Sequence, residues 1–125
     1  MHYYRFIVGK LGIYEAVERD CPKDDVRRLQ KPDGSWLPKV GNKYPGAISF
    51  WTQEGLEKYY SSGLFHWHCS VVREKVQVIV ITTPIDILYQ DQYQVICSVM
   101  NGDAAKTIAV EKLDHKHSNP PKNKD

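Results

Sequence analysis

The sequence contains no long run of apolar residues, no repeated segment and no heptad pattern. A helix that crosses a membrane needs about 20 mostly apolar residues, whereas the mean hydropathy of this chain is −0.50. These absences exclude a transmembrane helix, a solenoid and a coiled coil. The chain also lacks the P-loop of many nucleotide-binding enzymes and the G-x-S-x-G motif of serine hydrolases, so neither enzyme class is expected.

The chain has little excess of charge of either sign. Lys and Arg total 17 and Asp and Glu total 15, which gives a net charge of +2 and an isoelectric point near 8.4. Domains that bind nucleic acids usually have a basic patch and an isoelectric point above about 9. In the segment 18–47 five acids accompany seven bases, which are Arg19, Lys23, Arg27, Arg28, Lys31, Lys39 and Lys43. Nucleic acid is therefore not an expected partner.

Cysteine is scarce as well. The three cysteines, Cys21, Cys69 and Cys97, are an odd number at wide spacing, whereas a small secreted domain usually carries an even set. The N-terminal residues lack the basic stretch, the apolar core and the cleavage site of a signal peptide. We therefore expect a cytoplasmic protein with reduced thiols.

The length of the chain fits one domain. With 125 residues, of which 42% are hydrophobic and 26% are charged, it can bury a core without metal or disulfide support. We expect a single domain over residues 1–113 and a flexible polar tail over 114–125, which has no apolar anchor. Within the domain, residues 18–47 form a long irregular excursion with a short helical turn at 24–29.

Runs of β-branched and aromatic residues predict most of the strands. The expected strands are 3–8, 47–51, 75–83 and 92–100, with 85–90 as a linker. Asn101-Gly102-Asp103 has the composition of a hairpin turn, after which residues 107–110 return antiparallel. Residues 12–17 fit either a short strand or the first turn of a helix, and the pattern does not decide between the two.

One helix has clear boundaries. Thr52 stands at the N-cap position, Glu54 lies in the first turn and Gly63 ends the helix. A second short helix or turn follows at 64–68. Strands near both ends of the chain, with helices between them, predict an α+β fold. Its sheet is expected to be mainly antiparallel, continuous or split, with one or two short helices.

His66, His68 and Cys69 place three candidate zinc ligands within four residues. Two histidines separated by one residue share a face in a strand, but in a helix they point in different directions. A structural zinc site also needs a second pair of ligands, which Cys21 or Cys97 would have to supply from far along the chain. We therefore expect no metal and interpret the segment as an aromatic cluster at a helix end.

Three short segments of the chain form one pattern: Tyr4-Arg5-Phe6, then Ile48-Ser49-Phe50-Trp51-Thr52 with its trailing helix, and finally residues 88–95. Together they resemble the ADP-ribosyltransferase superfamily. The last is similar to the segment of the poly-ADP-ribose polymerase branch where a catalytic glutamate precedes tyrosine. Members of the superfamily hold NAD in a split antiparallel sheet. They use an Arg or His on the first core strand, a Ser-Thr-Ser or Tyr motif on a second strand, and a Glu on a late strand.

The resemblance implies a protein that binds NAD or a related nucleotide through Arg5, Ser49 and Gln92. Arg5, with His2 as the alternative, would contact the pyrophosphate, Ser49 the nicotinamide ribose and Gln92 a ribose hydroxyl. The aromatic residues implied at the cofactor are Tyr14, Trp51, Tyr60 and Tyr93. Gln92 stands where the superfamily has its catalytic glutamate, and an amide keeps a hydrogen bond but not the negative charge that stabilises an oxocarbenium-like transition state. The resemblance thus implies either an ADP-ribosyltransferase-like enzyme or a catalytically degenerate relative.

A non-enzymatic interaction module is the second hypothesis. The chain has eight Tyr, three Trp and three Phe, and the energetic centres of protein interfaces are enriched in Trp, Tyr and Arg. The candidate anchors are Trp36, Tyr44, Trp51 and Trp67. Such a module would regulate or inhibit a larger protein. The first hypothesis makes the more specific prediction about the structure, because it needs Arg5, Ser49 and Gln92 to lie around one cleft.

Overall fold

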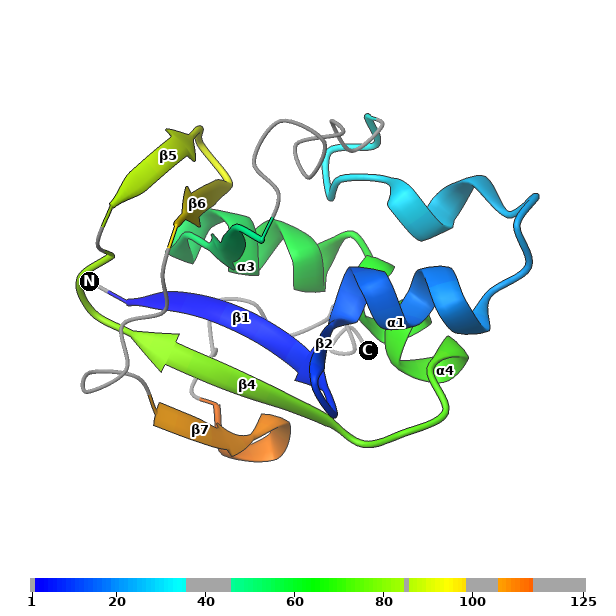
Figure 1. Cartoon of the computed structure of the whole chain (residues 1–125). Coiled ribbons are helices and arrows are strands. Elements are labelled where there is room, and N and C mark those ends of the chain that lie inside the picture. Colours follow the sequence, from blue (N-terminus) through cyan, green and yellow to red (C-terminus); the bar gives the residue numbers. More distant parts are fainter. Residues whose placement is uncertain (1, 36–45, 85, 99–105, 114–125) are drawn as a thin grey trace.

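The computed structural model describes residues 2–35, 46–84, 86–98 and 106–113 (Figure 1). The strands are β1 (Tyr3–Val8), β2 (Leu11–Gly12), β3 (Ile48–Trp51), β4 (Val76–Ile81), β5 (Ile87–Gln90), β6 (Gln94–Cys97) and β7 (Lys106–Ala109). The helices are α1 (Ile13–Asp20), α3 (Gln53–Ser61) and α4 (Leu64–Val71), with 3-10 turns η1 (Val26–Leu29) and η2 (Val110–Lys112). Neighbouring strands pair antiparallel, so the predicted α+β fold with a mainly antiparallel sheet is confirmed.

The sheet is joined most weakly in its middle. Its strand order is β5-β6-β3-β1-β4-β7, with β2 attached to β1. In the described strands β1 and β4 share six residue pairs, whereas β1 and β3 share one, between Tyr4 and Trp51. This junction divides the sheet into a half made of β5, β6 and β3 and a half made of β1, β4 and β7.

Apolar side chains are buried on both faces of the sheet. The alternation of β1 directs Tyr4, Phe6 and Val8 into a core shared with α1, α3 and α4, which lie together on one side of the strands (Figure 1). The second core is smaller and comes from both halves of the sheet; its buried members are Phe50, Ile79, Ile81, Val95 and Cys97. Because it draws on both halves, this core holds them together where the backbone pairing is sparse.

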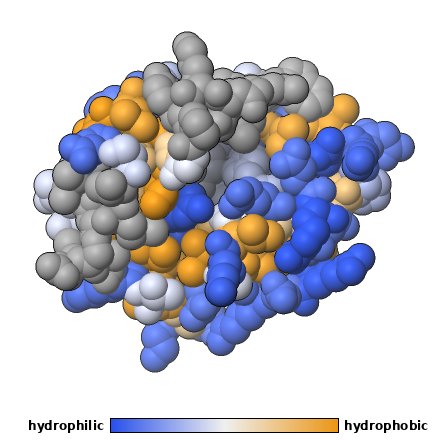
Figure 2. Space-filling view, viewed as in Figure 1, coloured by the Kyte–Doolittle hydropathy of each residue, from blue (hydrophilic) through white to orange (hydrophobic). Residues whose placement is uncertain are grey.

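Figure 2 shows the surface of the molecule in the same view as Figure 1. Hydrophilic residues cover most of the right side, where α1 lies, and hydrophobic residues are visible among the hydrophilic ones nearer the strands. Three large hydrophobic residues of the described chain are more than a third exposed, at 52%, 46% and 40%; they are Val26, Ile87 and Leu88. Two of these belong to β5, which forms one edge of the sheet.

The start of α3 agrees with the prediction made from Thr52. Its hydroxyl accepts a hydrogen bond from the Gly55 N–H at 2.9 Å, as an N-cap does, and its own N–H donates to the Tyr93 carbonyl at 3.0 Å. Gly63 then adopts a φ of 82°, which separates α3 from α4. The cap therefore begins the helix and also ties it to the turn before β6.

Two predictions about the helices were incomplete. Residues 12–17 proved to be the end of β2 and the start of α1, which continues into the first residues of the 18–47 excursion. The described chain thus has three α-helices instead of one or two. The buried residues of α1, Ile13, Ala16 and Val17, have the three- and four-residue spacing of a helix face. The pattern covers barely two turns, which is why the sequence left it open.

Two predictions about the strands were wrong. Residues 85–90 are not a linker, because β5 occupies 87–90 and pairs with β6. The residues expected at 107–110 form β7 at 106–109, which pairs with β4 and so is not the hairpin partner of the preceding strand. The turn at 101–103 and the tail at 114–125 lie outside the described residues.

Candidate functional site

Two of the three implied site residues meet at the junction of the two half-sheets. The first two segments that carry the resemblance lie on the neighbouring strands β1 and β3, and the third, residues 88–95, runs from β5 through a turn into β6, which pairs with β3. The Arg5 side chain on β1 donates from Nη1 to the main-chain carbonyl of Ser49 on β3, at 3.2 Å. The contact uses the backbone of Ser49 and not its hydroxyl.

Gln92 lies apart from that contact. In the β3–β6 register Ser49 faces Ile96 and Trp51 faces Gln94, so Gln92 lies beyond the C-terminal end of β3. There the Thr52 hydroxyl donates to its carbonyl at 2.9 Å, and its side-chain amide donates to the carboxylate of Glu54 on α3. The structure therefore brings Arg5 to Ser49 and places Gln92 with the start of α3.

Glu54 lies beside Gln92, but the sequence did not identify it as a candidate site residue. An acid in the first turn of a helix is an ordinary start signal, and Glu54 was interpreted in that sense. Its proximity to Gln92 depends on how α3 packs against the turn before β6, which no local pattern reports. A carboxylate therefore lies next to the amide that stands at the glutamate position of the resemblance.

Arg5 has an unusual environment for a charged residue. It is half-buried, and burial lowers the pKa of its guanidinium, an effect that the nearby Glu15 carboxylate partly offsets. Among the described residues it forms no ion pair, and the contact with Ser49 is its hydrogen bond. The guanidinium lies against the Cα of Gly12, since a Cβ built there would be 2.9 Å from Nη2 and 3.3 Å from Cζ.

Gly12 and Glu15 belong to the start of α1. Gly12 is its N-cap, and the Gly12 N–H donates to Oε1 of Glu15 at 2.9 Å, so the carboxylate caps the helix. The Arg5 cation therefore lies at the N-terminal end of a helix. The helix dipole makes that end positive, so a cation there is unfavourable unless an anion accompanies it.

The aromatic residues implied at the cofactor separate into different groups. Tyr14 and Trp51 have ring centroids 6.2 Å apart, and Tyr59 lies 4.9 Å from Trp51, all within the helix-side core. Tyr60 is 6% exposed and packs on Phe65 at 4.5 Å. These rings stabilise the core in this structure and do not stand around Arg5.

Tyr93 acts through its main chain. Its carbonyl accepts from the Thr52 N–H at 3.0 Å and lies against the Cα of Gly55. Its N–H donates to Asp91 at 2.8 Å. Asp91 also accepts from the Gln94 N–H, from the Tyr89 hydroxyl and from Lys31. Asp91 therefore orders the turn that carries Gln92, and these hydrogen bonds lower the pKa of its carboxyl although burial opposes them.

The candidate zinc ligands do not converge. His66 is exposed and His68 is fully buried, because both lie on α4, where a separation of two residues turns them apart. The Tyr59 hydroxyl is 2.5 Å from Nδ1 of His68. Burial raises the pKa of Cys69 to about 11, so its thiol stays protonated at neutral pH. In the described ranges no group of three or more His, Cys, Asp or Glu could hold a metal ion.

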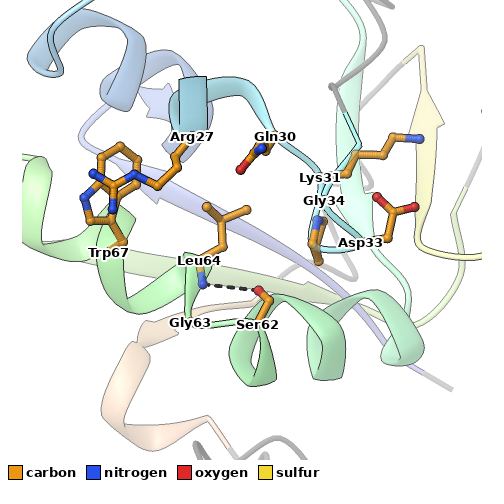
Figure 3. Close-up of a pocket in the computed structure, with 10 residues that line it drawn as sticks. Arg27, Gln30, Lys31, Asp33, Gly34, Ser62, Gly63, Leu64 and Trp67 are labelled. Carbon is orange, nitrogen blue, oxygen red and sulfur yellow. Dashed lines mark hydrogen bonds between the residues drawn. The ribbon is translucent and has the colours of Figure 1, made fainter. Parts of the chain in front are cut away.

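A pocket of about 380 Å³ lies between the 27–34 segment and the junction of α3 with α4. In Figure 3 Gln30 and Leu64 point into it, and Arg27 lies over Trp67, with Cζ 4.0 Å from the ring centroid. The two cations among the described residues of its lining are paired, Arg27 with Asp25 at 2.8 Å and Lys31 with Asp91 at 3.2 Å. Arg5, in contrast, forms no ion pair with a described residue.

Of the two candidate interaction anchors that the structure describes, Trp51 and Trp67, Trp67 lines this pocket. Trp51 is 7% exposed and belongs to the core. Trp36 and Tyr44 lie outside the described residues. The structure thus offers one half-buried tryptophan, already covered by Arg27 on one ring face, to a protein partner.

Comparisons of the chain with protein-family models, with curated proteins and with solved structures found no match. Within the residues that the structure describes, no helix is long and apolar enough to cross a membrane.

Proposed function

We propose that this protein binds a dinucleotide such as NAD at the junction between β1 and β3, with Arg5 as the residue that binds the phosphates. The observation that carries the proposal is that the half-buried Arg5 forms no ion pair with a described residue, although the Glu15 carboxylate lies near it. A half-buried guanidinium offers five N–H donors, and one hydrogen bond to a described residue uses one of them. Its position at the start of α1 adds the positive end of a helix dipole.

A pyrophosphate supplies what this environment lacks. Its negative charges would offset the desolvated cation and the helix dipole together, and its oxygens match the planar donor geometry of a guanidinium. Hydrogen bonds between a cation and an anion are about twice as strong as neutral ones. An anionic ligand is therefore favoured over a neutral one at this position.

The resemblance to ADP-ribosyltransferases favours NAD among anionic ligands. In that superfamily the NAD-binding residues come from a first strand, a second strand and a late strand. Here β1 and β3 are neighbours, the third segment leads through a turn into β6 beside β3, and the sheet is weakly joined between β1 and β3. Gln92 lies apart from Arg5, with Glu54 at the start of α3, so the proposed site rests on Arg5 and the Ser49 main chain and does not include Gln92. Release of nicotinamide, measured in the same samples, distinguishes an active enzyme from a degenerate relative.

The test compares thermal unfolding of the protein with NAD, with ADP-ribose and with adenosine, which has no phosphate. A ligand at a hundredfold excess over its dissociation constant should stabilise the protein by about 2.7 kcal/mol. We expect this for NAD and ADP-ribose and not for adenosine. Arg5→Gln should weaken binding about tenfold or more, because it removes charge-assisted hydrogen bonds. Arg73→Gln, which changes an exposed arginine, is the matched control and should bind normally.

Gly12→Ala tests the same site without removing the charge. The backbone of Gly12 has φ −67° and ψ 157°, which alanine adopts freely. The three atoms nearest to the new Cβ all belong to the Arg5 guanidinium. The flexible side chain should move aside at little cost to folding, and the affinity for NAD should fall by about threefold to tenfold. Calorimetric titration measures the affinity, and the melting temperature of the free protein checks the fold. Normal affinity in both Gly12→Ala and Arg5→Gln would contradict the proposal.

A further inference from the structure

We propose that Glu15 is an internal competitor for the anion position at Arg5, and that a bound pyrophosphate displaces its carboxylate from the Gly12 N–H. This inference rests on the proposed function and adds a residue that sets which anions the site accepts. Three groups define the position: the Arg5 guanidinium, the Gly12 main chain and the Glu15 carboxylate.

These three groups lie next to one another. The guanidinium lies against the Cα of Gly12, and the N–H of the same residue donates to Glu15 at 2.9 Å. Glu15 attracts Arg5 electrostatically but does not form an ion pair with it. The carboxylate thus occupies a main-chain donor beside Arg5, while the guanidinium donates one hydrogen bond, to Ser49, among the described residues.

Glu15 can leave this position easily. Glu15 is exposed, so its side chain can rotate into solvent without burying its charge. Once it leaves, the Gly12 N–H and the guanidinium are two adjacent donors for a phosphate oxygen. A multiply charged pyrophosphate would gain contacts with both, whereas a weak monovalent anion would not outcompete a carboxylate held in the same chain. Glu15 therefore favours pyrophosphate-containing ligands.

Glu15→Gln is the variant that isolates this role. Glutamine keeps an oxygen that can accept from the Gly12 N–H but removes the negative charge, so the helix cap is retained. We expect this variant to bind inorganic pyrophosphate, ADP-ribose and NAD about fivefold more tightly than the unmodified protein. Glu18→Gln, an exposed acid on the same helix, is the matched control and should leave the affinities unchanged.

The experiment is calorimetric titration of each ligand, together with the NMR signal of the Gly12 amide. In the unmodified protein that signal should shift when pyrophosphate binds, because its acceptor changes from carboxylate to phosphate. The three ligands separate recognition of a free pyrophosphate from recognition of a dinucleotide. If Glu15→Gln binds no more tightly than the unmodified protein while Arg5→Gln loses binding, the role of Glu15 is wrong and the proposed function stands. If neither the unmodified protein nor Glu15→Gln binds any of the three ligands, both proposals fail.

Discussion

Gly55→Ala is expected to destabilise the protein by about 3 kcal/mol, because there is no space for a side chain at this position. A Cβ on Gly55 would overlap the carbonyl oxygen of Tyr93, and it would be 2.9 Å from the carbonyl carbon and from Cε3 of Trp51. The obstacle is main chain on one side and a buried ring on the other, so neither can move aside cheaply. The start of α3 would have to shift away from the turn before β6.

That shift would break the connections that the start of α3 makes. The N–H of Thr52 donates to Tyr93 and its hydroxyl to Gln92, at 3.0 and 2.9 Å. Urea unfolding measures the change in free energy, with Lys58→Ala as the control. Lys58 is exposed on the same helix, and its replacement should change stability by less than about 0.5 kcal/mol. A Gly55→Ala protein as stable as the unmodified one would show that α3 does not approach Tyr93 so closely.

Acidification should remove up to about 3 kcal/mol of stability through His68 alone. Burial is the main cause that lowers the pKa of this imidazole from 6.5 to about 4, and the main chain of Arg27 opposes it. Above pH 6.5 the imidazole is neutral in the folded and the unfolded chain, so its contribution is complete. As the pH falls from 6.5 towards about 4, the unfolded chain binds a proton that the folded chain does not, and stability is lost.

The Tyr59 hydroxyl explains why the neutral imidazole suits this position. Burial raises the pKa of Tyr59, so the hydroxyl keeps its proton and donates it to Nδ1 of His68. Urea unfolding across this pH range should therefore give a steep profile for the unmodified protein and a flatter one for His68→Phe. His66→Asn is the control, because His66 is exposed, and it should keep the steep profile. An equally steep profile for His68→Phe would assign the pH dependence to other groups.

The parts of the fold that could be predicted are those with a local cause. The β-branched and aromatic run at 3–8 and the hydroxyl of Thr52 act within a few residues, and the strand and the helix start that they predict are confirmed. β5 was missed because it has four residues and forms only by pairing with β6. The separation of His66 from His68 could also be predicted, since it follows from helix geometry alone.

The site could be predicted only in part for the same reason. The resemblance selected Arg5 and Ser49, which do meet, but it could not show that the contact uses a carbonyl. The positions of Gly12 against Arg5 and of Glu54 against Gln92 depend on how helices pack on strands. Such contacts join residues that no periodicity relates, so they become visible only in three dimensions.

The sparse pairing between β1 and β3 has a thermal consequence for the molecule. Across most of the sheet, ladders of hydrogen bonds hold neighbouring strands, but the two halves share one residue pair and are joined mainly by apolar contacts, in the helix-side core and in the cluster around Phe50 and Ile81. Hydrophobic attraction weakens as water is cooled. On cooling, the contact between β1 and β3 should therefore loosen before the strand pairs on either side of it do.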